Sequence, residues 1–181
     1  MVFEIFVAIV VVLIIWAILI YNRFIKSRNV VKESWSGIDV QLKRRANLIP
    51  NLVETVKGYA KHERDAFKEV TELRSGTGLS VKERGRQESI ISKAIGGIMA
   101  IAEDYPDLKA NQNFLELQKN LNEVEEQIQH SRRYYNGSVR DWNVLVESFP
   151  SMIIASFCHF TLAEFFEIEN PDERNVPEVK F

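Results

Sequence analysis

The chain begins with a long run of apolar and aromatic residues, which limits its possible folds more than any other feature. The run reads "IFVAIVVVLIIWAILIY" and covers the 17 residues from Ile5 to Tyr21. Together with Met1 to Phe3 it reaches about 20 residues with Glu4 as the one charge, which is the length of helix that crosses a bilayer core. The sequence therefore predicts a transmembrane helix at residues 1–21.

The residues that flank this run favour a retained anchor over a cleaved signal peptide. A signal peptide needs basic residues before its apolar core and small residues at a cleavage site. Here Glu4 precedes the core and "NRFIKS" follows it. Cations crowd the following side, so the positive-inside rule places the short N-terminus outside and residues 22–181 in the cytoplasm, as a single-pass protein of the cell membrane.

The basic juxtamembrane segment, residues 22–30, would lie against the polar surface of the bilayer. Basic residues at this position attract anionic headgroups. We expect membrane lipid as a partner, and the candidate lipid-headgroup contacts are Arg23, Lys26, Arg28 and Lys32.

Beyond the anchor, apolar residues recur at steps of three or four, which is typical of amphipathic helices. The first such helix is expected from Val31 to Leu73, with a kink or a short break at Pro50. A glycine- and charge-rich connector is expected at Ser75–Gln87, and a second helix from about Glu88.

The third helix has the most regular apolar spacing, from Phe114 to its expected end at Pro150. The spacing places five residues of its second half in the core: Tyr135, Val139, Trp142, Val146 and Phe149. A densely apolar fourth helix is expected within Pro150–Glu167, where it would cover one end of the bundle.

The sequence contains no useful stretch of period-two alternation, so the predicted fold class is all-α. It comprises an N-terminal transmembrane helix followed by an antiparallel bundle of three long helices plus a short fourth helix. The expected domains are the anchor (1–21), the juxtamembrane segment (22–30), a cytoplasmic bundle (31–168) and an extended C-terminal tail (169–181).

Residue types that carry catalysis or bind metals do not form a recognisable motif. His62, His130 and His159 are far apart in sequence, and Cys158 is the one cysteine. We therefore expect no catalytic residue, no metal site and no cofactor. The formal net charge of −2 gives no reason to expect nucleic acid as a partner.

Several charged residues lack an opposite charge three or four places away, where helices usually pair them. These are Arg44, Arg45, Arg132, Arg133, Arg140 and Asp141. With Asn136 and Asn143 they form the candidate interaction or interhelical network. Half-buried polar groups must be satisfied, so a network between helices is the first interpretation, and an outward-facing binding surface is the alternative.

Four long strings of this sequence resemble the LemA family. They are "WSGIDVQLKRRANLIPNLVETVKGYAKHE" (Trp35–Glu63), "AEDYPDLKANQNFLELQ" (Ala102–Gln118), "SRRYYNGSVRDWNVLVESFPSMIIA" (Ser131–Ala155), and the ending from "FF" to "PEVKF" (Phe165–Phe181). One departure is His159, which stands where the family usually has a glycine. The resemblance implies a membrane-anchored helical bundle with most of its mass in the cytoplasm, and it implies no enzymatic activity and no catalytic residue.

The leading functional hypothesis is a non-enzymatic, membrane-anchored scaffold or adaptor, whose cytoplasmic bundle binds other proteins or copies of itself. The alternative is a module that senses membrane stress or lipid headgroups through the basic juxtamembrane segment.

Overall fold

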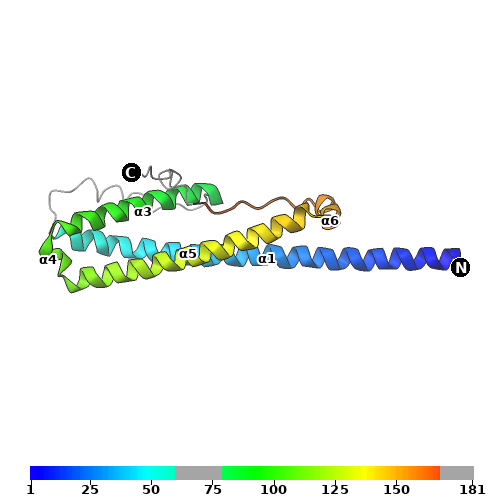
Figure 1. The fold of residues 1–181 in the computed structure, drawn as a ribbon, viewed down its shortest axis with the longest axis horizontal. Helices are drawn as coiled ribbons and strands as arrows, with labels where there is room; N and C mark the ends of the chain where they lie inside the picture. Colours follow the sequence, from blue (N-terminus) through cyan, green and yellow to red (C-terminus); the bar gives the residue numbers. More distant parts are fainter. Residues whose placement is uncertain (60–78, 168–181) are drawn as a thin grey trace, which may run out of the picture. The chain divides into compact units, whose positions relative to one another are not determined.

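A computed structural model describes residues 1–59 and 79–167 of the chain (Figure 1). These residues form helices α1 (Val2–Lys57), α3 (Val81–Glu103), α4 (Pro106–Lys109), α5 (Gln112–Glu147) and α6 (Ser151–Phe157). No strand occurs within the two described ranges, so the predicted all-α class is confirmed. The chain divides into two compact units: unit 1 contains Met1–Ile38 and Ser131–Glu164, and unit 2 contains Asp39–His130 and Phe165–Phe181.

Helix α1 runs for 56 residues without interruption, from the apolar run into the packed part of the protein. Pro50 lies inside the helix, which excludes a break at this position. The ring removes one backbone hydrogen bond, but Ile49, Leu52 and Val53 are buried on the adjoining turns, and their packing holds the helix together.

The predicted extension of this helix to Leu73 is wrong, because α1 ends at Lys57. Gly58 follows directly, and the backbone N–H of Tyr59 donates to the Val56 carbonyl in a closing turn. Glycine just after the last turn is a common helix stop, and this signal explains why the helix ends before Leu73. Residues 60–73 of the expected helix lie outside the described residues.

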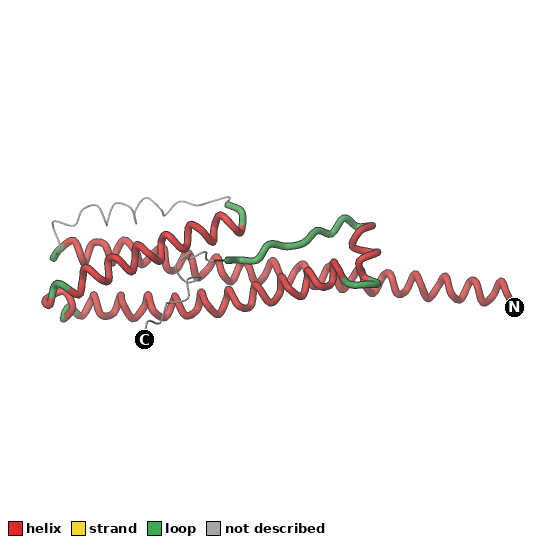
Figure 2. The backbone as a smooth tube through the Cα atoms, turned by 45° about the horizontal axis from the view of Figure 1, so that its top comes forward, coloured by secondary structure: helices red, strands yellow, loops and turns green. Residues whose placement is uncertain are grey.

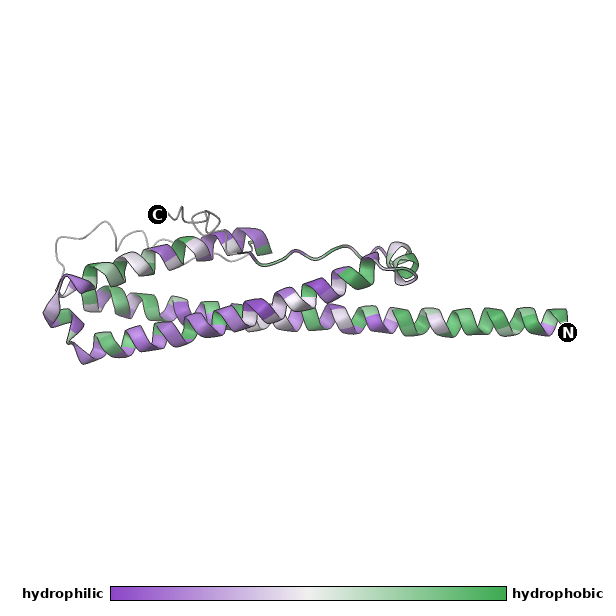
Figure 3. Ribbon diagram, viewed as in Figure 1, coloured by the Kyte–Doolittle hydropathy of each residue, from purple (hydrophilic) through white to green (hydrophobic). Residues whose placement is uncertain are grey.

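Figure 3 shows the start of α1 as a hydrophobic stretch, and most of its residues are exposed, as those of a lipid-facing segment would be. It is the one stretch in the described residues that is long and apolar enough to cross a membrane, and none of its most apolar 18-residue window is buried. The expected membrane-spanning segment therefore has the length, the apolarity and the exposure that a bilayer requires.

Unit 1 is built from the first part of α1, the end of α5, helix α6 and the extended segment that follows α6 (Figure 2). Its core contains Phe24, Trp142, Leu145 and Ala155, with Ile20 packed against the edge. Ring contacts pair Phe24 with Trp142 and, further along α1, Trp35 with Tyr135. As residue numbers on α1 increase those on α5 decrease, so the two helices are antiparallel.

The described residues of unit 2 form a bundle of α1, α3 and α5, with the single turn α4 connecting α3 to α5. In this unit α3 runs in the same direction as α1, and α5 runs antiparallel to both (Figure 1). Apolar side chains of all three helices and of α4 form the core: Ile49, Leu52, Val53, Val56, Ile91, Ile98, Ala102, Leu108, Phe114 and Leu121. Helix α1 supplies four of these ten residues, α3 three, α5 two and α4 one.

Helix α3 begins at Val81, so the expectation of a connector as far as Gln87 and a helix from Glu88 is wrong. Ser80 caps the helix: its hydroxyl accepts from the backbone N–H of Glu83, and the Glu83 carboxylate accepts from the backbone N–H of Ser80. This capping box satisfies donors that a helix start leaves open. Gly85 is buried in the second turn, where an added Cβ would lie 2.1 Å from the Glu167 carbonyl oxygen.

The end of the third helix and the fourth helix differ from the prediction in two ways. Helix α5 ends at Glu147, and Phe149 beyond it is 79% exposed, so its predicted core position is wrong. Helix α6 ends at Phe157 instead of continuing towards Glu167. His159 then adopts a positive φ of 55°, a conformation that glycine adopts without a Cβ clash, and the chain continues in an extended form.

Candidate functional site

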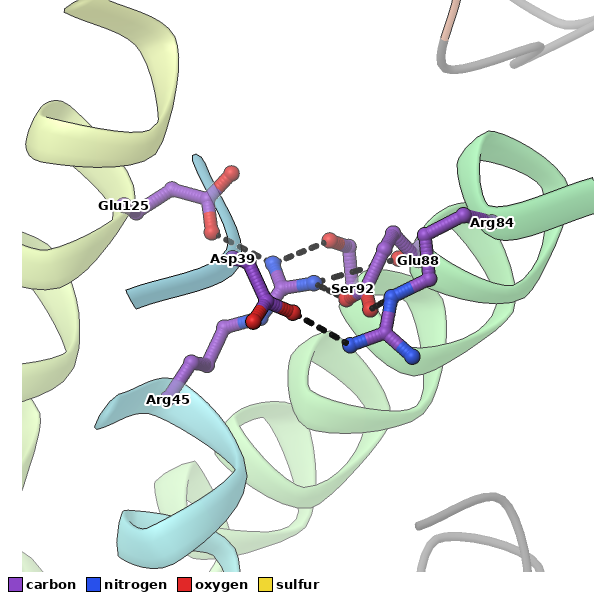
Figure 4. Close-up of polar contacts among 6 residues, drawn as sticks. All are labelled: Asp39, Arg45, Arg84, Glu88, Ser92 and Glu125. Atoms are coloured by element: carbon purple, nitrogen blue, oxygen red, sulfur yellow. Dashed lines mark hydrogen bonds and ion pairs between the residues drawn. The ribbon is translucent and has the colours of Figure 1, made fainter. Parts of the chain in front are cut away.

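The Arg45 side chain of α1 is buried inside unit 2, where it contacts polar groups of α3 and α5 (Figure 4). Its side chain is 1% exposed. The guanidinium pairs with the Glu88 carboxylate of α3, donates to the Ser92 hydroxyl over 2.9 Å, and pairs with the Glu125 carboxylate of α5 over 2.7 Å. One charge from α1 is thus matched by polar groups on both neighbouring helices.

A second layer of charges holds Glu88 in place. The Nε atom of Arg84 lies 3.2 Å from Glu88 one turn away, and its Nη2 atom lies 3.8 Å from the Asp39 carboxylate of α1. Asp39 also pairs with Lys43 at 2.6 Å. The Nε atom of Arg45 has no hydrogen-bond acceptor in the described part of the chain.

This arrangement favours one register of α1 against α3 and α5. Removing one member of a buried ion pair leaves the other charge without compensation, so sliding one helix past another would separate the pair at high cost. Arg45 is closed off from solvent, which makes it unsuited to contact an external partner. We call Arg45, Glu88, Ser92, Glu125, Arg84 and Asp39 the arginine network.

The other candidate network residues do not gather around Arg45. Arg44, one position away on α1, is exposed. Arg140 and Asp141 form an exposed pair with each other at 3.0 Å, with both side chains 70% exposed. Arg132 and Asn136 are half-buried, whereas Arg133 is exposed.

Asn143 belongs to a different set of contacts, in which α5 holds the extended segment after α6. Its side chain accepts from the Ala163 backbone N–H over 2.8 Å and donates to the Ala163 carbonyl over 3.1 Å. The Trp142 indole N–H donates to the Thr161 carbonyl, and the Tyr135 hydroxyl donates to the Glu164 carbonyl, each over 2.9 Å. These side chains give the extended backbone the partners that a helix would otherwise supply.

The Tyr135 hydroxyl is held in a largely apolar setting. Burial raises the pKa of Tyr135 above its ordinary value, and the nearby Glu164 carboxylate adds to the increase. The phenol therefore remains protonated, and able to donate to the Glu164 carbonyl, over the physiological pH range.

The four candidate lipid contacts lie directly after the apolar run of α1. Arg23, Lys26, Arg28 and Lys32 are all exposed. None of the four forms an ion pair with another described residue, although the Arg28 guanidinium lies 6.0 Å from the centre of the Phe160 ring. Their charges are therefore available to an anionic surface.

A polar groove between α1 and α5 in unit 2 was not predicted from the sequence. Its volume is about 450 Å³, and its lining residues are Leu48, Asn51, Glu54, Thr55, Asn113, Glu116, Leu117 and Asn120. Amides and carboxylates dominate this surface, so it offers acceptors for N–H groups and negative charge for cations. A signal was present, because Asn113, Glu116 and Asn120 recur at helical spacing and Leu48 and Leu117 belong to apolar stripes.

Groups that could hold a metal ion are not found among the residues that the structure describes. Four groups of polar side chains stand out among the described residues: the arginine network, the contacts of the extended segment, the exposed cations and the polar groove. Of these, the exposed cations and the polar groove are open to a partner.

Comparison with known proteins finds relatives that are each similar to most of this chain. The chain is 24% identical over 175 residues to the magnetosome protein MamQ 1 of Paramagnetospirillum magneticum, which covers 81% of this chain and 64% of the relative. It is 23% identical over 174 residues, with the same coverage, to the magnetosome protein MamQ of Magnetospirillum gryphiswaldense. It is 25% identical over 137 residues to protein LemA of Metamycoplasma hominis, covering 74% of this chain and 63% of that protein.

The chain thus spans slightly less than two thirds of the length of these relatives, and none of the three names describes an enzyme. The profile of the LemA family matches residues 34–181, which include α3, α4, α5, α6 and residues 34–57 of α1. Since this match covers most of the chain, the protein belongs to the LemA family.

Proposed function

We propose that this protein is a non-enzymatic, membrane-anchored scaffold whose helical bundle holds partner proteins or further copies of itself. The observation that carries the proposal is the continuity of α1, which passes from the apolar run into the packed helices without a linker. A continuous helix transmits position and orientation, whereas a flexible linker would only keep the soluble part near the membrane.

The distribution of charge around the span supports a cytoplasmic location for the bundle. Cations follow the apolar run directly, and Glu4 is the one charged side chain before it. This asymmetry favours an orientation with residues 22–181 on the cytoplasmic side of the cell membrane. The scaffold would then act at the inner face of that membrane.

The polar groove is the part of the bundle best suited to receive a partner. The Arg45 charge is satisfied internally, so it stabilises the scaffold and takes no part in recognition. Glu54, Glu116 and the groove asparagines instead present acceptors towards open space. A helix or an extended segment carrying lysine, arginine or free backbone N–H groups fits this chemistry.

Site-specific photo-crosslinking in intact membranes tests this proposal. A photoreactive amino acid is placed at Glu116 in the groove, and at Asn122, an exposed residue of α5 that does not line the groove, as the control. We expect Glu116 to give a discrete protein adduct that mass spectrometry identifies either as one partner or as a second copy. The photoreactive group at Asn122 should give much less of this protein adduct. Equal labelling at the two positions, or no protein adduct at either, would contradict the proposal.

A second candidate function is recognition of anionic lipid headgroups by the juxtamembrane cations. The specific observation in its favour is that Arg23, Lys26, Arg28 and Lys32 are exposed and form no ion pair with described residues. Native mass spectrometry of the full chain, released from mixed anionic and zwitterionic lipid, would measure the retained lipids. Replacing the four cations by glutamine should abolish any enrichment of anionic lipid, and equal retention of both lipid classes by the unaltered chain would exclude this function.

A further inference from the structure

Helix α6 presents an apolar face that no described residue covers. Its inner face buries Ser151 and Ala155, whereas Met152, Ile153 and Phe157 are 48%, 54% and 84% exposed. Phe149, just before the helix, is 79% exposed. These four residues follow one another at steps of three, one and four, so they extend along one side of the short element. We call Phe149, Met152, Ile153 and Phe157 the apolar face of α6.

The inner side of α6 fixes the position of this face along α1. Ala155 belongs to the core around Phe24 and Trp142, and Ile20 of α1 packs against the same core. Phe160, just beyond α6, stacks on Phe24 with ring centres 4.8 Å apart. It also contacts Tyr21, the last residue of the apolar run, at 6.2 Å.

The burial of residues on α1 also shows that α6 lies beside the end of the apolar run. Residues 2–15 of the helix are exposed throughout, but Trp16, Ala17 and Ile20 are half-buried. In unit 1 the last turns of the apolar run are therefore covered by the protein itself. Both ribbon views place α6 beside α1 at this level (Figures 1 and 2).

The level of Ile20 to Phe24 is where a spanning α1 leaves the hydrocarbon, because the apolar run ends at Tyr21 and the cations begin at Arg23. An apolar face at this depth meets the boundary between acyl chains and headgroups. The segment from Phe149 to Cys158 contains no charged residue, so no charge opposes entry into that boundary. Contiguous exposed apolar side chains with cations nearby are the composition of interfacial membrane contacts.

We propose that the apolar face of α6 is a second membrane contact, which inserts into the same phospholipid surface that α1 crosses. The proposal rests on the membrane anchoring that the scaffold function includes. The span alone leaves unit 1 free to rotate about the helix axis and to tilt. A second contact beside the span removes this freedom, and it gives unit 1 one defined orientation on the membrane.

Fluorescence quenching in reconstituted vesicles tests the proposal on the full chain. Single-cysteine variants are made in a Cys158→Ser background and labelled with an environment-sensitive dye at three positions. Phe157→Cys reports on the apolar face of α6, and Leu13→Cys reports on the middle of the span. Tyr134→Cys is the matched control, an aromatic residue of unit 1 that is 60% exposed on α5. It lies beside Tyr135, which contacts Trp35, some 14 residues or about 21 Å along α1 from the end of the run.

Two quenchers separate lipid from water: spin-labelled phospholipid and aqueous iodide. We expect the dye at position 157 to be quenched by the lipid and to be several-fold less sensitive to iodide than the dye at position 134. Replacing Phe149 by serine, a change at an exposed residue, should weaken the lipid quenching measured at position 157.

The proposal is overturned if position 157 behaves like position 134 while position 13 is quenched by lipid, and the membrane anchor then stands alone. If position 13 also behaves as water-exposed, the anchoring fails and the scaffold function in its proposed form fails with it. Protection of position 157 that shows no lipid quenching and disappears on dilution of protein in lipid would identify a second copy as the occupant, and would also overturn the proposal.

Discussion

At the scale of single residues, Arg45 brings a full charge into the core of unit 2. Replacing it with methionine leaves Glu88, whose side chain is 4% exposed, without its main partner. We expect Arg45→Met to lower the free energy of unfolding by about 3–5 kcal/mol, the usual cost of breaking a buried pair. Chemical denaturation of the full chain in lipid nanodiscs measures this change.

Two further variants separate the charge effect from the loss of side-chain volume. Arg44→Met, at the exposed neighbouring position, should change stability by less than about 0.5 kcal/mol. Arg45→Met combined with Glu88→Gln should regain part of the loss, because no uncompensated carboxylate then remains buried. A cost for Arg45→Met as small as that for Arg44→Met would show that the pair contributes little.

Trp142 lies in the core of unit 1. It is 5% exposed, contacts Phe24 and Phe160 edge-on, and donates its indole N–H to the Thr161 carbonyl. Trp142→Ala should cost about 3–5 kcal/mol, and Trp142→Phe, which keeps an aromatic ring but removes the hydrogen bond, should cost about 1–2 kcal/mol. Thermal unfolding ranks the two variants, and an alanine variant as stable as the parent would exclude Trp142 from the core.

Among the described residues, His159 is the one whose backbone conformation favours a different amino acid. Its φ of 55° brings a Cβ close to the backbone, which costs about 1–2 kcal/mol in the left-handed region and is avoided by glycine. After the extra flexibility of glycine in the unfolded chain is counted, His159→Gly should stabilise the protein by about 0.5–1 kcal/mol. His159→Ala serves as the control and should bring no gain; equal midpoints for the two variants would contradict the explanation.

The candidate network could be predicted from the sequence only in part. The absence of local acids singled out Arg44 and Arg45 together, although only Arg45 is buried. The apolar stripe contained the missing information, since Leu42, Arg45 and Ile49 follow at steps of three and four on one face. Glu88 and Glu125, by contrast, are 43 and 80 positions away from Arg45, and only the packing of three helices brings them together.

At the scale of elements, the start of α3 depends on one cap. The Glu83 carboxylate accepts from the Ser80 backbone N–H and hydroxyl, and these bonds lower the pKa of Glu83 below its ordinary value. The resulting stabilisation is fully present above the unfolded-state pKa, about 4.3. It is lost as the pH falls through the lower, folded-state pKa.

We therefore expect acidification below about pH 4 to loosen the first turn of α3. Amide hydrogen exchange at residues 81–84, corrected for the intrinsic pH dependence, measures this loosening. Ser80→Ala should weaken the same turn by about 1 kcal/mol at neutral pH and should remove the extra response to acid. Identical protection in the variant and the parent at every pH would show that the cap does not hold this helix end.

Two elements differ from the prediction for two different physical reasons. The capping box at Ser80 lies inside a glycine- and charge-rich stretch, whose composition indicated a connector. The segment after α6 is apolar enough for a helix, but Tyr135, Trp142 and Asn143 of α5 supply its backbone with hydrogen bonds. Such partners are distant in sequence, so local periodicity could not identify this segment as extended.

At the scale of the whole molecule, the parts predicted best are those with long, uniform patterns. The apolar run, the regular stripe of α5 and the all-α class follow directly from residue spacing, and the structure contains each of them. The polar groove and the apolar face of α6 depend on which side of a helix remains uncovered. That property is set by neighbouring elements, so residue spacing identifies the polar positions of the groove but not that they stay uncovered.

The scaffold proposal depends on the continuity of α1 across the end of the span. Ile18 and Ser36 are both exposed, and they lie 18 residues apart, which is five full turns, on the same face of α1. Spin labels at Ile18→Cys and Ser36→Cys, in a Cys158→Ser chain reconstituted in vesicles, allow a dipolar distance measurement. A continuous helix predicts one narrow distribution near about 27 Å. A broad distribution, or one centred at clearly shorter distances, would reveal a joint between span and bundle and would contradict the account.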